Sequence, residues 1–237
     1  MRKKKITSVF LMIGFMLVLG ACGSKAQGEG AFSQSAKGAA ESGASSESGS
    51  ASAKGAGKDA DVPKNGVEIA SAKDLLAFRD RVNAGEDSLN AVLTADIDLS
   101  GVCGEGVGDW VSIGITDGEP VIYEGTFDGG GYTISGLYGT DHDRTVGLFS
   151  GLGSDSTVRG LTMAELFIDT EHGGAIAHTI EGRVENCNVN GQVTGLQVGG
   201  LAWEVGETGV LTCCSYAGSV KATSHAGCLI WQSIGLI

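Results

Sequence analysis

The sequence is poor in proline and in basic residues, and it lacks the motif of one large enzyme class. Only two prolines stand against 40 glycines among its 237 residues. Sixteen Lys and Arg residues face 28 Asp and Glu residues, which gives a net charge of −12. This balance argues against nucleic acid and bare anionic lipid headgroups as partners, because both are bound through basic patches. No HExxH motif is present, so the paired histidines of a zinc metallopeptidase are missing.

The cysteines also lack the CxxC spacing that is typical of structural zinc sites. Cys22 stands alone near the start, and five more follow: Cys103, Cys187, Cys213, Cys214 and Cys228. Five is an odd number, so at least one of them is unpaired if the chain is exported. We therefore predict no metal site and no cofactor.

The first 22 residues have the organisation of an export signal. Arg2 and Lys3 to Lys5 precede an apolar run from about Val9 to Leu19, which is short for a bilayer span of about 20 residues. The stretch from Leu19 to Cys22 reads LGAC and resembles the lipobox of bacterial lipoproteins. The resemblance implies that residues 1–21 are removed, that Cys22 carries a lipid, and that the chain is anchored on the extracellular face of the bacterial cell membrane. An ordinary cleaved signal with a chance cysteine is the alternative.

Residues 22–62 have the composition of a disordered tether. Gly, Ser and Ala supply 27 of the 40 residues that follow Cys22, and Phe32 is the only aromatic residue there. Such a segment cannot bury enough apolar surface to offset its ordering entropy. A flexible coil of this length spans roughly 35 Å. We expect it to hold the folded part away from the membrane.

Residues 63–145 are predicted to form a capping helix and the first strands. Ser71 to Asp74 reads as a capping box, in which the serine side chain accepts a hydrogen bond from the third helical amide. Leu75, Phe78 and Val82 follow at helical spacing, and Gly85 is a plausible stop. The next segment, AVLTADIDLSG, alternates as a strand does.

Residues 146–237 repeat with a period of about 26. One marker begins at Gly147, Gly174, Gly200 and Gly227, and an independent marker is Val158, Val184 and Val210. The LxxLxLxxN pattern of leucine-rich repeats is absent, and the units are too rich in Gly, Asn, Thr and Val for helical repeats. The sequence therefore predicts an all-β protein, a right-handed parallel β-helix with about 26 residues per rung. Continuing the valine period reaches Leu236, from which we expect that the last rungs are truncated.

The same period predicts which residues stack on one another. Leu161, Cys187 and Cys213 would share one slot, which we interpret as interior packing because all three residue types bury well. A disulfide between Cys187 and Cys213 is the alternative. Cys213 and Cys214 would point to opposite faces of a strand, which argues against pairing between them.

Several segments together resemble bacterial surface proteins with GLUG repeats. These segments are ADIDLSG, WVSIGI, YEGTFDGGGYTISGL, VGLFSGL and STVRGLTM, and the resemblance runs from Val67 to Ile237. That family is similar to pectin-lyase-like right-handed β-helices, and its repeat also accompanies the peptidase domain of some IgA-cleaving metalloproteases. The resemblance implies this fold and a surface location. It supplies no catalytic residues to transfer.

Four groups of side chains are candidates for chemistry or binding. Asp96 and Asp98 share one strand face, where turn and strand-end hydrogen bonding is favoured over calcium binding. The segment from Asp141 to Arg144 mixes acids with bases and is interpreted as a solvated loop with internal charge pairing. The period places His172 near Val198 and His225, with no carboxylate pair beside them. A platform of Trp110, Trp203 and Trp231 could stack on sugars, but core or edge packing is favoured because Trp203 and Trp231 lie 28 residues apart.

The glycine cluster from Asp128 to Gly131 is predicted to be a hairpin-like turn. Tyr132 and Ile134 follow in strand alternation and no helix begins there, so a phosphate-binding loop is not expected. The protein is accordingly predicted to have no catalytic residues and not to be an enzyme. We expect an adhesion or binding module for a glycan or a host or matrix surface. The alternatives are a carbohydrate-active lyase or hydrolase and a stalk that presents a missing C-terminal domain.

Overall fold

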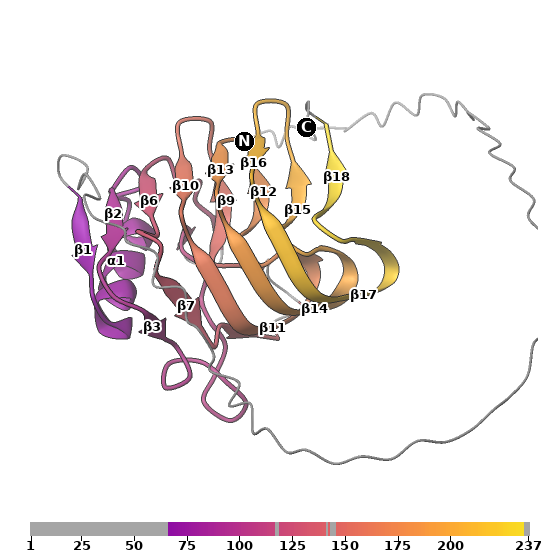
Figure 1. Cartoon of the computed structure of the whole chain (residues 1–237), viewed down its shortest axis with the longest axis horizontal. Coiled ribbons are helices and arrows are strands. Elements are labelled where there is room, and N and C mark those ends of the chain that lie inside the picture. Colours follow the sequence, from indigo (N-terminus) through magenta and orange to yellow (C-terminus); the bar gives the residue numbers. More distant parts are fainter. Residues whose placement is uncertain (1–65, 117–118, 141, 143–145, 235–237) are drawn as a thin grey trace, which may run out of the picture. The chain divides into compact units, whose positions relative to one another are not determined.

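The protein is a parallel β-solenoid of about six turns with about 27 residues per turn and one short helix (Figure 1). The fold is seen in a computed structural model that describes residues 66–116, 119–140, 142 and 146–234. The predicted all-β, parallel β-helix class is confirmed. The predicted signal segment, Cys22 and the tether lie outside the described residues.

Helix α1 (Ala72–Asn83) begins where the capping box predicts. The Ser71 hydroxyl oxygen accepts a hydrogen bond from the Asp74 amide at 3.3 Å, and the Asp74 carboxylate accepts one from the Ala70 amide at 3.2 Å. Leu75, Phe78 and Val82 are its buried residues, as their spacing predicts. The helix therefore caps the first turns of the solenoid with one apolar stripe.

Three stacked parallel sheets form the walls of the solenoid. The first contains β1 (Val67–Ile69), β2 (Ala91–Leu93), β6 (Thr126–Asp128), β10 (Thr157–Arg159), β13 (Arg183–Glu185) and β16 (Val210–Thr212). The second contains β3 (Ile97–Asp98), β7 (Thr133–Ser135), β11 (Thr162–Gly173), β14 (Asn188–Gly199) and β17 (Ser215–Gly227), with β8 (Tyr138–Gly139) beside β11. The third contains β9 (Phe149–Leu152), β12 (Ala177–Ile180), β15 (Ala202–Val205) and β18 (Ile230–Ser233). A small antiparallel pair, β4 (Ile115–Thr116) and β5 (Glu119–Pro120), forms a separate sheet.

The core is aromatic near the helix and aliphatic farther along the axis. The rings of Phe78, Tyr123, Phe127 and Phe149 pack with centroids 5.0–6.0 Å apart. In the later turns the buried column is built from smaller side chains such as Val158 and Val184. Inward-facing residues of each turn thus rest on those of the next, which is how a solenoid buries a continuous core.

The register confirms part of the predicted stacking and corrects the rest. Val158 pairs with Val184 as predicted, but Val184 pairs with Leu211 rather than Val210. In the third sheet Ala177 pairs with Ala202, and Ala202 pairs with Ile230. Turn length in this sheet therefore varies by three residues. Corners and bulges share the difference, since the ladders of β14 with β11 and with β17 each shift register once.

The glycine cluster is a corner rather than a hairpin. Gly130 and Gly131 have φ values of +58° and +78°, as a turn requires, but the strands that they join, β6 and β7, belong to different sheets. Asp128 organises this corner: one carboxylate oxygen accepts the Gly130 amide at 2.9 Å, and the other accepts Arg159 Nε and Nη2 at 2.9 and 2.8 Å. The prediction of a turn with positive φ is confirmed, and the hairpin geometry was wrong.

Candidate functional site

The long strands of the second sheet present a polar outer face. Side chains on β11 and β14 alternate, so that Met163, Ile168 and Val193 face the core while their neighbours face outward. Three outward columns run across successive turns of this sheet. The first is Tyr138, Phe167, Gln192 and Ser219; the second is Asp169, Thr194 and Lys221; the third is Glu171, Leu196 and Thr223.

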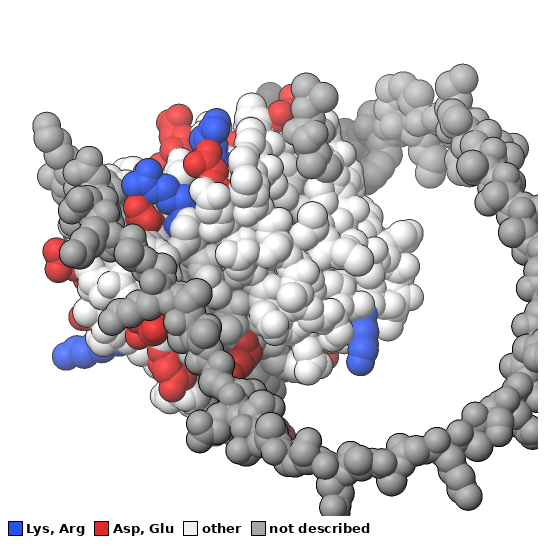
Figure 2. Space-filling model, viewed as in Figure 1, with Lys and Arg blue, Asp and Glu red and all other residues white. Residues whose placement is uncertain are grey.

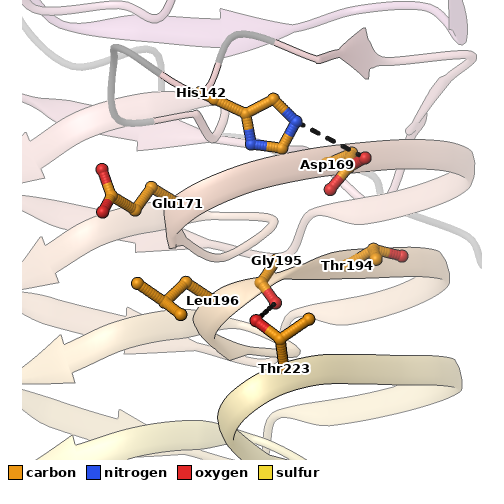
Figure 3. Close-up of a pocket in the computed structure, with 7 residues that line it drawn as sticks. All are labelled: His142, Asp169, Glu171, Thr194, Gly195, Leu196 and Thr223. Carbon is orange, nitrogen blue, oxygen red and sulfur yellow. Dashed lines mark hydrogen bonds and ion pairs between the residues drawn. The ribbon is translucent and has the colours of Figure 1, made fainter.

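A hollow of about 530 Å³ lies on the second and third columns (Figure 3). Asp169 and Glu171 come from β11, and His142 reaches in from the loop above them. His142 Nε2 lies 3.6 Å from Asp169 Oδ2, which forms an ion pair when the imidazole is protonated. The rest of the lining is uncharged: Thr194, Gly195, Leu196 and Thr223. The hollow therefore joins two carboxylates and an imidazole to hydroxyl groups and one apolar side chain.

A second hollow, of about 540 Å³, lies farther back along the same strands. Its walls carry Asn190, Gln192 and Ser219, and Phe167 stacks on Tyr138 with centroids 5.5 Å apart. Its floor contains Gly191 and Gly218, and a Cβ built on Gly218 would lie only 2.0 Å from the Gly191 carbonyl oxygen. Glycine is required there because the turns approach each other too closely for a side chain.

The surrounding face carries little charge. In the view of Figure 2, Lys, Arg, Asp and Glu side chains gather toward the end of the solenoid that contains β1 to β10, while the surface over the later turns is mostly uncharged. Lys221 is an exposed cation on β17. A ligand on this face would meet amides and hydroxyls over most of its length, with the carboxylates of Asp169 and Glu171 at the first hollow and that of Glu165 at the second.

A stack of aromatic rings lies on the third sheet, outside both hollows. The imidazole of His178 stacks on Trp203 at 4.5 Å and 7°, and Trp203 stacks on Trp231 at 5.1 Å and 11°. The 28-residue separation of the two tryptophans equals the local turn length, since Ala202 pairs with Ile230. The inference that their spacing argues against one shared face was therefore wrong. Because the rings cover one another, the faces between them are not free to stack on a sugar.

Burial and charge affect His178 within this stack. Desolvation lowers the pKa of His178 to about 4, and the nearby His172 contributes in the same direction. Trp203 Nε1 is buried and has no hydrogen-bond partner. Trp110 lies elsewhere: it is 4% exposed and donates to the Leu148 carbonyl oxygen, so it packs in the core. The three tryptophans do not form one platform.

The other sequence candidates are dispersed. Asp98 accepts the Ser100 amide at 2.8 Å in a local turn, whereas Asp96 accepts the Thr133 amide of the next turn of the solenoid at 2.8 Å. Asp141, Asp143 and Arg144 lie outside the described residues, and His142 joins the first hollow. His172 shares its column with Gln197 and His225, rather than with Val198.

The five cysteines that the structure describes are free thiols, and their stacking differs from the prediction. Asn188 pairs with Ser215, so Cys187 lies over Cys214 while Cys213 is exposed. Leu161 and Cys187 are buried as expected. Cys103 is buried separately near Gly136, and desolvation raises its pKa.

Sequence reasoning missed Asp169 and Glu171 as members of a site. The segment FIDTEHG contains the pattern that indicates them, because its acids occupy alternate positions of a strand and therefore share its outer face. Within the described ranges no group of three or more His, Cys, Asp and Glu residues could hold a metal ion. Among those same residues no helix is long and apolar enough to cross a bilayer.

Comparison with known proteins gives one local and one structural likeness. No family model matches the chain. A 98-residue segment is 39% identical to Halomucin from Haloquadratum walsbyi, covering 40% of this chain and 1% of that protein. The fold is similar to that of a putative immunoglobulin A1 protease from Bacteroides ovatus, with a TM-score of 0.58 and 20% identity over 73% of this chain and 55% of that one. At this identity the likeness shows the fold alone.

The prediction that the protein is not an enzyme is contradicted by this likeness. That prediction depended on the absence of a recognisable catalytic motif and on the resemblance to a repeat without catalytic residues. The same fold is found in a chain described as a putative protease. A β-solenoid of this kind is therefore no argument against catalysis, because outward side chains from successive turns can meet without any linear motif.

Proposed function

We propose that the protein is a surface-displayed binding module whose β-solenoid holds a glycan chain along the outer face of β11, β14 and β17. The observation that carries this proposal is the first hollow, where Asp169, Glu171, Thr194 and Thr223 line one side of a largely uncharged face. Carboxylates and hydroxyls pair with sugar hydroxyls, and Leu196 offers an apolar contact to a pyranose ring. The adjacent amides of Asn190 and Gln192 extend the same chemistry toward the second hollow.

The proposal includes the cell-surface location implied by the lipobox. The local similarity to Halomucin supports a role at the surface, as does the acidic composition without a basic patch. Cys22 would hold the chain on the membrane through a lipid, and the GLUG-type turns would be presented beyond the tether. Incorporation of labelled fatty acid into wild type and into Cys22→Ala tests the anchor, and equal labelling of both would contradict it.

Glycan binding is tested with the purified full chain on a printed array of plant, bacterial and host glycans. We expect a restricted set of ligands, with affinity reduced about tenfold or more in Asp169→Asn and Glu171→Gln, since each removes a charged acceptor for sugar hydroxyls. Glu207→Gln is the matched control, because Glu207 is exposed in a turn outside both hollows. No binding by the wild type, or equal loss in the control, would reject this assignment.

A second candidate function is cleavage of the bound glycan. Asp169 and Glu171 lie two residues apart on one strand face, and His142 lies beside Asp169. Paired carboxyl groups serve as acid and base or nucleophile in glycoside hydrolases. Release of new reducing ends from an array-positive glycan would support it. Glu171→Gln would then lose turnover by a larger factor than it loses binding.

A further inference from the structure

Cys187 and Cys214 occupy equivalent corners of successive turns. A two-residue corner joins β13 to β14, and another joins β16 to β17. The flanking strands are in register, with Glu185 opposite Thr212 and Asn188 opposite Ser215. Each cysteine is the second residue of its corner, so the two lie one above the other. Neighbouring strands are about 4.8 Å apart, within the Cα separation of about 4.4–6.8 Å that a disulfide bridges.

The first residue of each corner decides which cysteine faces inward. Asn186 and Cys213 both have φ of 53°, a left-handed conformation that turns the chain. As a result the side chain of Cys213 is exposed while the following thiol enters the wall of the solenoid. The prediction that Cys213 shares the slot of Cys187 fails because this turn is one residue longer than the preceding one.

The two inward thiols lie on adjacent turns, and each is the largest influence on the pKa of the other. Cys214 Sγ also lies 3.3 Å from the Val184 carbonyl oxygen, and Cys187 Sγ lies 3.3 Å from that of Glu185. Cys187 is completely buried, whereas Cys214 is half-buried and accessible from the solvent side of its corner.

The two cysteines differ in reactivity. The neighbouring Cys187 side chain lowers the pKa of Cys214, which favours its thiolate form. The Cys214 side chain, together with burial, raises the pKa of Cys187 and keeps it protonated. The accessible member is therefore the nucleophile, and the buried member is the second thiol that can resolve a mixed disulfide.

We propose that Cys187 and Cys214 are a reversible disulfide pair that cross-links two successive turns of the solenoid. The oxidant is a small-molecule or protein disulfide. The Cys214 thiolate attacks one sulfur of that disulfide, its S–S bond breaks, and one thiolate leaves. Cys187 then loses its proton and attacks Cys214 Sγ, which expels the second thiolate. Both protein thiols are oxidised and the external disulfide is reduced to two thiols. This inference is independent of the proposed glycan binding.

The test is oxidation of the purified full chain with oxidised glutathione at pH 7.5, followed by digestion with trypsin and a glutamyl endopeptidase. The latter cuts after Glu204 and Glu207, between the two cysteines. We expect a peptide that contains Cys187 linked to one that contains Cys214, and release of the link by dithiothreitol. Cys214→Ser removes the link, whereas Cys213→Ser, the matched neighbour, preserves it.

A further variant separates the mechanism from the fold. Cys187→Ser should trap glutathione on Cys214, since the resolving thiol is gone, and circular dichroism checks that the chain remains folded. Loss of the link in Cys213→Ser with retention in Cys214→Ser would overturn the pairing. So would a wild-type chain that is glutathionylated at exposed Cys228 but keeps Cys187 and Cys214 as thiols.

Discussion

The imidazole of His178 lies flat against the indole of Trp203, with centroids 4.5 Å apart and planes 7° apart. This packing removes the imidazole from water, and the pKa of His178 falls to about 4. An unfolded histidine has a pKa of about 6.5. The folded chain therefore binds fewer protons than the unfolded chain between these values. The stabilisation is complete above about pH 6.5 and is lost as the pH falls toward 4.

The first prediction is that stability becomes less sensitive to acid in His178→Gln. In the wild type the free energy of unfolding should fall by about 2 kcal/mol between pH 7 and 4.5 through this one group. The variant should lack that contribution, although its stability at pH 7 is lower because the stack is altered. Urea unfolding at several pH values measures the slope. His225→Gln, an exposed histidine, is the control, and parallel curves for wild type and His178→Gln would contradict the assignment.

The second prediction concerns the aromatic core under α1. Phe127 is fully buried between Phe78 and Phe149, at centroid distances of 5.7 and 5.5 Å. Phe127→Ala should lower the free energy of unfolding by about 3–5 kcal/mol, because it removes buried surface and leaves a cavity. Denaturant unfolding measures the loss. Val107→Ala, at a site 57% exposed, should change stability by less than about 0.5 kcal/mol.

The third prediction concerns the start of α1. Ser71→Ala removes the acceptor of the Asp74 amide and should cost about 1 kcal/mol. Ser71→Thr keeps a hydroxyl oxygen at the same position and should recover most of that loss. Thermal unfolding of the three proteins tests this order. Equal melting temperatures for Ser71→Ala and wild type would show that the cap contributes nothing.

The fourth prediction concerns the close approach of turns beneath the first hollow. A Cβ on Gly195 would lie 1.8 Å from the Thr170 carbonyl oxygen, so the backbone must shift to admit it. Gly195→Ala should therefore destabilise the protein by about 1–3 kcal/mol or more. Gly101→Ala is the comparison, because nothing lies within 4 Å of a Cβ there. A smaller loss at Gly195 than at Gly101 would contradict the close approach.

The fold was predictable because the constraint on it is repetitive. Every turn must bury a side chain at equivalent positions, and the spacing of Val158 and Val184 records that requirement directly. The register of each pair of neighbouring strands was less predictable. The corner between β15 and β16 has four residues where that between β12 and β13 has two, so turn length can vary while the core column stays intact. A period inferred from a few marker residues averages over these differences in turn length. It therefore assigns some residues to the wrong neighbour in the next turn.

The site was only partly predictable. The outward alternation of Asp169 and Glu171 follows from strand geometry and could have been found in the sequence. The contact of His142 with Asp169 could not, because His142 lies outside the strands and its position does not follow from the strand period. The stacking of Trp203 on Trp231 was similarly hidden, since it depends on a turn length of 28 rather than 26 residues.

Burial differs between the strands of the second sheet, and this difference affects which strands unfold locally first. β11 and β14 alternate between buried and exposed residues, whereas every residue of β17 is at least partly exposed. In a solenoid each turn is stabilised mainly by its neighbours, so amide hydrogen exchange should become faster from β11 toward β17. Thr223 and Cys214 belong to the turn that contains β17. Fraying of that turn would remove one wall of the first hollow and separate the thiol pair while the earlier turns remain folded.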